Sequence, residues 1–230
     1  MDLVIATTCA DFKFHELALT YKTFFDNLSL PKSTPIYINI DQYGHGEASH
    51  FCAKIASMFS DSVSVNIKEP NFPLAVKWCY EQTSKHDYVL STEDDWFLHD
   101  RIDITKLISM LEAYDQVALR AYPRYDRHPW CLGPNIAKGK TLGILANLLR
   151  PDKNPEQWIR QNYNSTSTCF YPPLPSRIII EDIGRQQNYY VRNSRTEEQF
   201  VNYEVKDGTN WNNNISLLDQ SELVRRSRSS

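Results

Sequence analysis

Three consecutive acidic residues, Glu93, Asp94 and Asp95, follow the short apolar run at residues 88–90. Adjacent carboxylates repel one another, so such a cluster needs a compensating cation or strong hydrogen bonds. A hard divalent ion (Mg2+ or Mn2+) supplies that charge, prefers oxygen ligands and keeps coordination sites for phosphate oxygens. The cluster therefore predicts a metal site suited to a diphosphate, whose departing charge must be neutralised. The alternative is an exposed acidic loop or the first turn of a helix.

The first hundred residues alternate between the periodicities of strands and helices. Strands are predicted at residues 3–8, 35–41, 62–67 and 88–90, and helices at 12–25, 47–59 and 74–83. This order implies a three-layer α/β fold with a mainly parallel central sheet and helices on both faces. Ligands of such sheets bind beyond the carboxyl ends of the strands. We therefore expect Thr7, Thr8, Asp41 and the acidic cluster at one binding edge.

The second half of the chain is less regular. We predict a strand at 117–121, helices at 139–149 and 154–162, and a strand at 177–180 that ends at Glu181 and Asp182. No internal repeat or domain boundary is evident in the sequence.

An aromatic and basic loop covers residues 122–130. Aromatic rings stack on sugar rings while charged groups fix the hydroxyls, so this loop is a candidate sugar-binding wall. Its candidate residues are Tyr122, Arg127, His128 and Trp130. The alternative is that Tyr122 and Trp130 pack under the loop.

The segment Asp87-Tyr88-Val89-Leu90-Ser91-Thr92-Glu93-Asp94-Asp95-Trp96 resembles the DxD-type motif of the GT-A glycosyltransferases, in a Glu-Asp-Asp form. The order of elements over residues 1–190 is also similar to that of family 2 of these enzymes. The resemblance implies a GT-A, Rossmann-like fold that moves a sugar from a nucleotide-diphosphate donor, by family frequency a UDP-sugar, to a glycan, glycoprotein or other hydroxyl acceptor. It assigns Asp95 and Asp94 as metal ligands, Glu93 and Asp94 as donor-binding residues, and Mn2+ or Mg2+ as the cofactor.

The resemblance also assigns residues around the nucleotide. Thr7 and Thr8 match the first-strand loop that borders the base and ribose, and Asp41 matches a position that often holds the nucleoside. Lys77 lies on the helix before the acidic strand and is a candidate phosphate ligand. A solvated helix lysine is the alternative for Lys77.

A further match is the segment 178–185, which resembles the Glu-Asp element found late in family 2. There a carboxylate removes the proton from the acceptor hydroxyl, as inverting transfer requires. Asp182 is the first candidate for this base and Glu181 the second. The structural alternative is an ion pair on a helix surface between Glu181 and Arg185, four residues apart.

Under this resemblance, residues 1–203 form one catalytic domain, with a nucleotide-binding half (1–100) and an acceptor-side half (101–203). Residues 204–230 are expected to form a partly disordered extension. All six histidines precede residue 129, so the late histidine that often supplies another metal ligand in the family is missing. The Gln-x-x-Arg-Trp element of processive synthases is also missing. We therefore expect a single-transfer enzyme with weak or substrate-assisted metal binding. Inversion at the anomeric carbon is the first expectation, and retention stays open as the alternative.

Composition restricts the partners and the compartment. The net charge of −3 gives no reason to expect nucleic acid as a partner. Five scattered cysteines without a CxxC pair argue against a disulfide framework and a structural zinc site. We find no signal peptide and no apolar run long enough for a membrane span, so a cytoplasmic location is expected. The basic tail at residues 225–228 is either a solvated end or a weak contact for anionic lipid.

Two other functions fit the same pattern. A catalytically silent glycan-binding module would keep the fold and the aromatic loop without needing nucleotide or metal. A sugar-phosphate nucleotidyltransferase would be expected to carry a glycine-rich, basic loop after the first strand. Residues 7–11 contain neither glycine nor a basic side chain, which counts against this second alternative.

Overall fold

The computed structural model describes residues 2–43, 46–120, 130–163, 167–173 and 179–183. Within them, a seven-stranded sheet has the order β3-β2-β1-β4-β7-β6-β8. Its strands are β1 (Leu3–Ala10), β2 (Ile36–Asp41), β3 (Val63–Lys68), β4 (Tyr88–Glu93), β6 (Gln116–Leu119), β7 (Asn135–Lys138) and β8 (Thr168–Tyr171). Strand β7 runs antiparallel to β4 and β6, and the other neighbouring pairs are parallel. The predicted mainly parallel sheet is confirmed.

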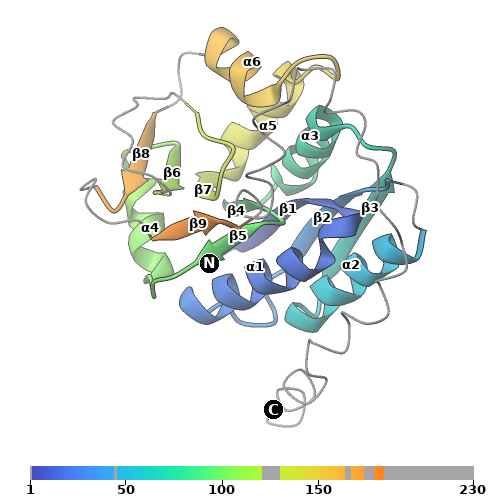
Figure 1. Ribbon diagram of the computed structural model, residues 1–230. Helices are drawn as coiled ribbons and strands as arrows, with labels where there is room; N and C mark the ends of the chain where they lie inside the picture. The colour runs from blue at the N-terminus through green and yellow to red at the C-terminus, as the bar shows by residue number, and fades with distance from the viewer. Residues whose placement is uncertain (1, 44–45, 121–129, 164–166, 174–178, 184–230) are drawn as a thin grey trace. The chain divides into compact units, whose positions relative to one another are not determined.

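Helices cover both faces of this sheet (Figure 1). Helices α1 (Phe14–Asn27) and α2 (Gly46–Phe59) lie on one face, and α3 (Phe72–Thr83) and α5 (Gly139–Leu148) lie on the other. The alternation of side chains along β1 explains the arrangement. Thr7 contacts Tyr21 of α1, whereas Ala6 packs in the apolar cluster that contains Val76 of α3 and Leu142 of α5. The three-layer α/β fold is therefore confirmed.

Two helix starts follow directly from local sequence. Asn71 precedes α3 and its side chain accepts a hydrogen bond from the Leu74 N–H. Asn154 does the same for the Gln157 N–H at the start of α6 (Pro155–Asn162). Both helices also carry a proline in the first turn, where the missing N–H costs nothing.

A second, two-stranded sheet joins distant parts of the sequence. Strand β5 (Trp96–Leu98) directly follows the acidic cluster and pairs antiparallel with β9 (Ile180–Asp182). The periodicity of the sequence did not predict four elements: β5, α4 (Ile104–Met110), β7 and β8. Strand β9 contains Glu181 and Asp182, which the sequence placed just after the strand.

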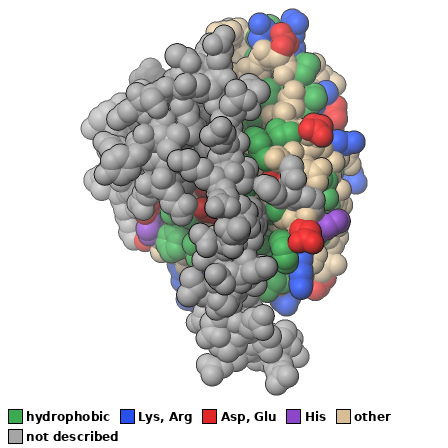
Figure 2. All heavy atoms as spheres, turned by 45° about the vertical axis from the view of Figure 1, so that its right-hand side comes forward, with side chains coloured by type: hydrophobic (Ala, Val, Ile, Leu, Met, Phe, Trp, Pro, Cys, Tyr) green, Lys and Arg blue, Asp and Glu red, His purple; other side chains and the backbone are tan. Residues whose placement is uncertain are grey.

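Residues Met1–Gln187 form one compact unit. Residues 188–230, including the basic tail, lie outside the described residues, so the boundary at 203 stays a prediction. On the face shown in Figure 2, acidic and basic side chains are interspersed over the described surface, in line with the small net charge. None of the helices in the described ranges is long and apolar enough to cross a membrane.

Candidate active site at the ends of β1 and β4

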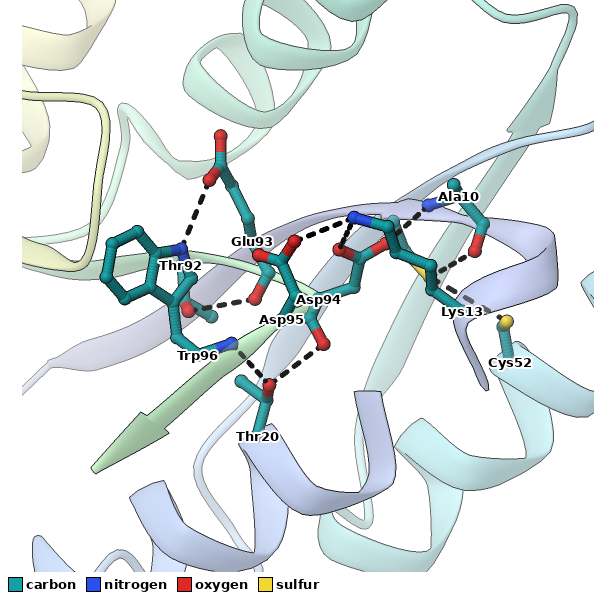
Figure 3. A network of polar contacts seen from close by, with 10 residues as sticks. Ala10, Lys13, Thr20, Cys52, Thr92, Glu93, Asp94, Asp95 and Trp96 are labelled. Carbon is teal, nitrogen blue, oxygen red and sulfur yellow. Dashed lines mark hydrogen bonds and ion pairs between the residues drawn. The ribbon is translucent and has the colours of Figure 1, made fainter. Parts of the chain in front are cut away.

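Lys13 and the acidic cluster meet where two parallel strands end. Strands β1 and β4 are neighbours, with Thr8 opposite Glu93, so the segments that leave both strands lie together. Lys13 Nζ is 2.7 Å from Asp95 Oδ2 and 3.3 Å from Asp94 Oδ1 (Figure 3). The second Asp94 oxygen accepts the Ala10 N–H at 2.7 Å. The cation that compensates these carboxylates in the structure is therefore a lysine.

Burial and neighbouring charges shift the pKa values of Glu93, Asp94 and Lys13. Burial, reinforced by repulsion from Asp95, raises the pKa of Glu93 to about 8. Burial also raises the pKa of Asp94, although the nearby Lys13 ammonium opposes the shift. For Lys13, burial alone would lower the pKa, but Asp94 and Asp95 raise it well above the ordinary value. Lys13 is therefore charged, and Glu93 is mostly protonated at neutral pH.

Helix α1 fixes the turn that carries these acids. The Thr20 hydroxyl donates to the Asp94 carbonyl at 2.9 Å and accepts the Trp96 N–H at 3.0 Å. The Trp96 indole N–H in turn donates to Glu93 Oε2 at 3.1 Å. The turn is thus a buried link between β4 and β5, and the alternative of an exposed acidic loop or helix start is wrong.

The β5–β9 pairing brings Asp182 to the same edge. Asp182 pairs with Trp96, and the Ile183 N–H donates to the Asp95 carbonyl at 2.9 Å. Directly paired residues share one side of a two-stranded ribbon, so Asp182 lies on the buried side with Trp96. Its exposed fraction is 7%. Glu181 lies on the opposite side, where its half-exposed carboxylate is 3.1 Å from His99 Nε2.

Asp41 ends β2, next to the end of β1, in register with Ala10. Burial raises the pKa of Asp41 to about 6, against the effect of a 2.9 Å hydrogen bond from the Asn39 amide. Nearby, Thr8, Phe72, Ser91 and Glu93 contribute to the lining of a groove between α3 and the strand ends. The Ser91 hydroxyl is buried there without a hydrogen-bond partner among the described residues. The groove has about 20 Å³ of free space, which fits one water molecule that would supply that partner.

Three other predicted site residues have side chains that contact the interior or other helices, and not the binding edge. Thr7 is fully buried and accepts a hydrogen bond from the Tyr21 hydroxyl, so its side chain cannot reach a nucleotide in this conformation. Lys77 pairs with Glu81 and donates to the Ala146 carbonyl of α5, away from the acidic cluster. Trp130 is fully buried and donates to the Tyr80 hydroxyl, which corrects its assignment to the sugar wall in favour of core packing.

The remaining loop candidates, Tyr122, Arg127 and His128, lie outside the described residues.

The predicted metal ligands fit a divalent ion in their chemistry, but their oxygens are directed at Lys13. Asp94 and Asp95 offer two carboxylates, and the described residues contain no group of three or more His, Cys, Asp or Glu side chains arranged for a metal. Magnesium commonly uses one or two carboxylates together with phosphate oxygens of the substrate and water. A metal ion here would therefore need ligands from the donor and a different position of the Lys13 ammonium.

Sequence reasoning missed Lys13. Strand β1 extends to Ala10, so the segment that leaves the strand begins at Asp11 and includes Lys13. This segment therefore carries a basic side chain, and the expectation that it has none, which considered residues 7–11 only, is wrong. The usable signal was the spacing, because Lys13 stands within one short turn of the strand end.

Comparison with known proteins gave matches at the level of structure. Neither a protein-family model nor a curated protein matches the chain. The mannosyltransferase PcManGT from Pyrobaculum calidifontis, solved with GDP-Man and Mn2+, matches with a TM-score of 0.60 and 10% identity, over 82% of this chain and 59% of that chain. TarS from S. aureus matches with a TM-score of 0.54 and 10% identity, over 90% of this chain and 41% of TarS. The chain has the fold of the nucleotide-diphospho-sugar transferases.

Nucleotidyltransferases share this fold. A cytidylyltransferase from Leptospira borgpetersenii matches with a TM-score of 0.53 and 12% identity, over 86% of this chain and 90% of that one. At such identities the likeness establishes the fold of the chain, and the choice between glycosyl and nucleotidyl transfer depends on the site.

Proposed function

We propose that the chain is a glycosyltransferase that moves a sugar from a nucleotide-diphosphate donor to a hydroxyl acceptor. The observation that carries the proposal is the β5–β9 pairing, which sets Asp182 beside the acidic turn held by Lys13. Glycosyl transfer needs positive charge near the leaving diphosphate and a base near the acceptor hydroxyl. The Lys13 ammonium is proposed for the first role and the Asp182 carboxylate for the second.

The proposed reaction is a single displacement. The acceptor oxygen bonds to the anomeric carbon, the bond from that carbon to the diphosphate oxygen breaks, and the diphosphate leaves with the electron pair. Asp182 takes the proton of the acceptor hydroxyl, and Lys13 offers positive charge at the diphosphate. Asp94 and Asp95 would hold a divalent ion, which would help to neutralise the leaving group. Attack opposite the leaving group inverts the anomeric centre.

The donor is proposed to lie across the ends of β1, β2 and β4. Asp41 would contact the nucleoside, because it ends β2 beside the end of β1, in register with Ala10. UDP-sugars and GDP-sugars are the first donors to test, since TarS has been solved with UDP-GlcNAc and PcManGT with GDP-Man.

A nucleotidyltransferase is the second candidate, favoured by Lys13 and by the likeness to the Leptospira cytidylyltransferase. In that reaction a sugar phosphate attacks the α-phosphate of a nucleoside triphosphate and pyrophosphate leaves. Basic side chains beside the first strand would then hold the triphosphate. A silent glycan-binding module remains the third function, and it would bind sugars without consuming a nucleotide.

One assay separates the three functions. The chain is incubated with UDP-GlcNAc, UDP-glucose or GDP-Man and simple sugar acceptors, and release of the nucleoside diphosphate is followed. Parallel reactions contain CTP or UTP with a sugar 1-phosphate, and release of pyrophosphate is followed. Glycosyl transfer predicts a nucleoside diphosphate in the first set. Pyrophosphate in the second set alone would establish nucleotidyl transfer instead, and turnover in neither set would support the binding module.

A further inference from the structure

We propose that Lys13 is an exchangeable counter-ion. In the free chain it pairs with Asp94 and Asp95. In the donor complex, a divalent ion would bind the two carboxylates and the Lys13 ammonium would move to the diphosphate. The inference rests on the proposed function for its second half only. It assigns to Lys13 control over when a metal ion can bind.

The contacts of Lys13 carry the first step. Its ammonium lies within ion-pair distance of one oxygen from each aspartate, and its side chain is 21% exposed. The two carboxylate side chains are 5% and 13% exposed, so a cation arriving from solvent meets oxygens that are already paired. A divalent ion must therefore compete with an internal cation, which weakens its binding to the free chain.

Charge balance carries the second step. Lys13 with two ionised aspartates leaves one excess negative charge, which repels a diphosphate. A divalent ion added to the same three side chains reverses the balance to one excess positive charge. The site then attracts a diphosphate, and the released ammonium, with its three N–H donors, can bind a phosphate oxygen.

The test measures binding of Mn2+ alone and binding of UDP and GDP with Mn2+ to the wild type, Lys13→Gln and Lys13→Arg. Lys22→Gln is the matched control, because Lys22 forms an exposed ion pair with Asp26 on α1. Free Mn2+ is followed by electron paramagnetic resonance, nucleotide binding by calorimetry, and folding of each variant by thermal unfolding.

If Lys13 exchanges in this way, Lys13→Gln should change the affinity for Mn2+ alone and the affinity for nucleotide with Mn2+ in opposite directions. Lys13→Gln should bind Mn2+ alone about tenfold more tightly than the wild type, because the carboxylates lose their internal cation. It should bind the nucleoside diphosphate with Mn2+ about tenfold more weakly, because the phosphate loses an ammonium contact. Lys13→Arg, which keeps the charge, and Lys22→Gln should both stay close to the wild type for Mn2+.

The outcomes separate this inference from the proposed function. Unchanged or weaker Mn2+ binding by folded Lys13→Gln would overturn the exchange, whatever the nucleotide does. Tighter Mn2+ binding without binding of either nucleotide would support Lys13 as the counter-ion and count against the proposed function. Tighter binding of both Mn2+ and nucleotide by Lys13→Gln would overturn the transfer of the ammonium to the diphosphate.

Discussion

At the scale of single residues, burial raises the pKa of three acids at the binding edge, Asp41, Glu93 and Asp94. Asp41 is 8% exposed, and burial raises its pKa from 3.8 to about 6. The folded chain therefore keeps a proton on Asp41 over a pH range in which the unfolded chain has released it. Stability should fall as pH rises from about 4 to about 6 and then remain lower by at most about 3 kcal/mol.

Asp41→Asn removes this penalty. The variant should gain little below pH 4 and up to about 3 kcal/mol above pH 6, since the amide oxygen can still accept the Asn39 hydrogen bond. Urea unfolding at several pH values measures the difference. Asp61→Asn, at an exposed position, serves as the control. A gain for Asp41→Asn that is the same at pH 4 and pH 7 would contradict the argument.

Residue types predicted the place of the site better than the role of each side chain. The acidic cluster, Asp41 and Thr8 were expected near one sheet edge because each follows or ends a predicted strand, and the structure brings them there. Trp130 and Thr7 could not be assigned in this way. Aromatic and hydroxyl side chains serve equally well in a core, and burial depends on packing that local sequence does not show.

At the scale of elements, α1 positions the acidic turn through Thr20. The Thr20 hydroxyl bonds to the Asp94 carbonyl and to the Trp96 N–H, both buried. Thr20→Val keeps the shape and leaves these backbone groups unpaired, so it should lower the free energy of unfolding by about 1–3 kcal/mol. Chemical denaturation measures this loss. Ser57→Ala, which removes an exposed hydroxyl on α2, should change stability by less than about 0.5 kcal/mol.

Equal stability losses for Thr20→Val and Ser57→Ala would contradict the claim that the Thr20 hydroxyl holds the acidic turn in place. A loss of stability in Thr20→Val together with weaker nucleotide binding would connect the turn geometry to the proposed donor site.

Element length explains which parts of the fold were predictable. Strands β1 and β2 are long apolar runs, and their helices show clear amphipathic spacing, so their order followed from the sequence. Strand β5 has three residues, and β7 and β8 have four each. Such short segments span too few residues to show a period. Their strand state depends on partners supplied by the rest of the chain.

At the scale of the whole molecule, the site depends on the pairing of β5 with β9, which joins residues 96–98 to residues 180–182. Contacts at this separation leave no local pattern in the sequence, and they form only as the surrounding sheet assembles. The resemblance suggested Asp182 as a base, and the structure sets it on the buried side of the ribbon with Trp96. Donor, metal and base are thus proposed to meet where two separate segments of the chain are joined.

The most direct test of this proposal compares two neighbouring acids on β9. With a donor identified by its released nucleoside diphosphate, Asp182→Asn should lower the transfer rate by about 100-fold or more while donor binding persists. Glu181→Gln, on the opposite side of the ribbon, should stay within about threefold of the wild type, because it changes an exposed side-chain contact with His99. If Asp182→Asn keeps the wild-type rate, or if Glu181→Gln alone loses it, the proposed base and the site built around it are wrong.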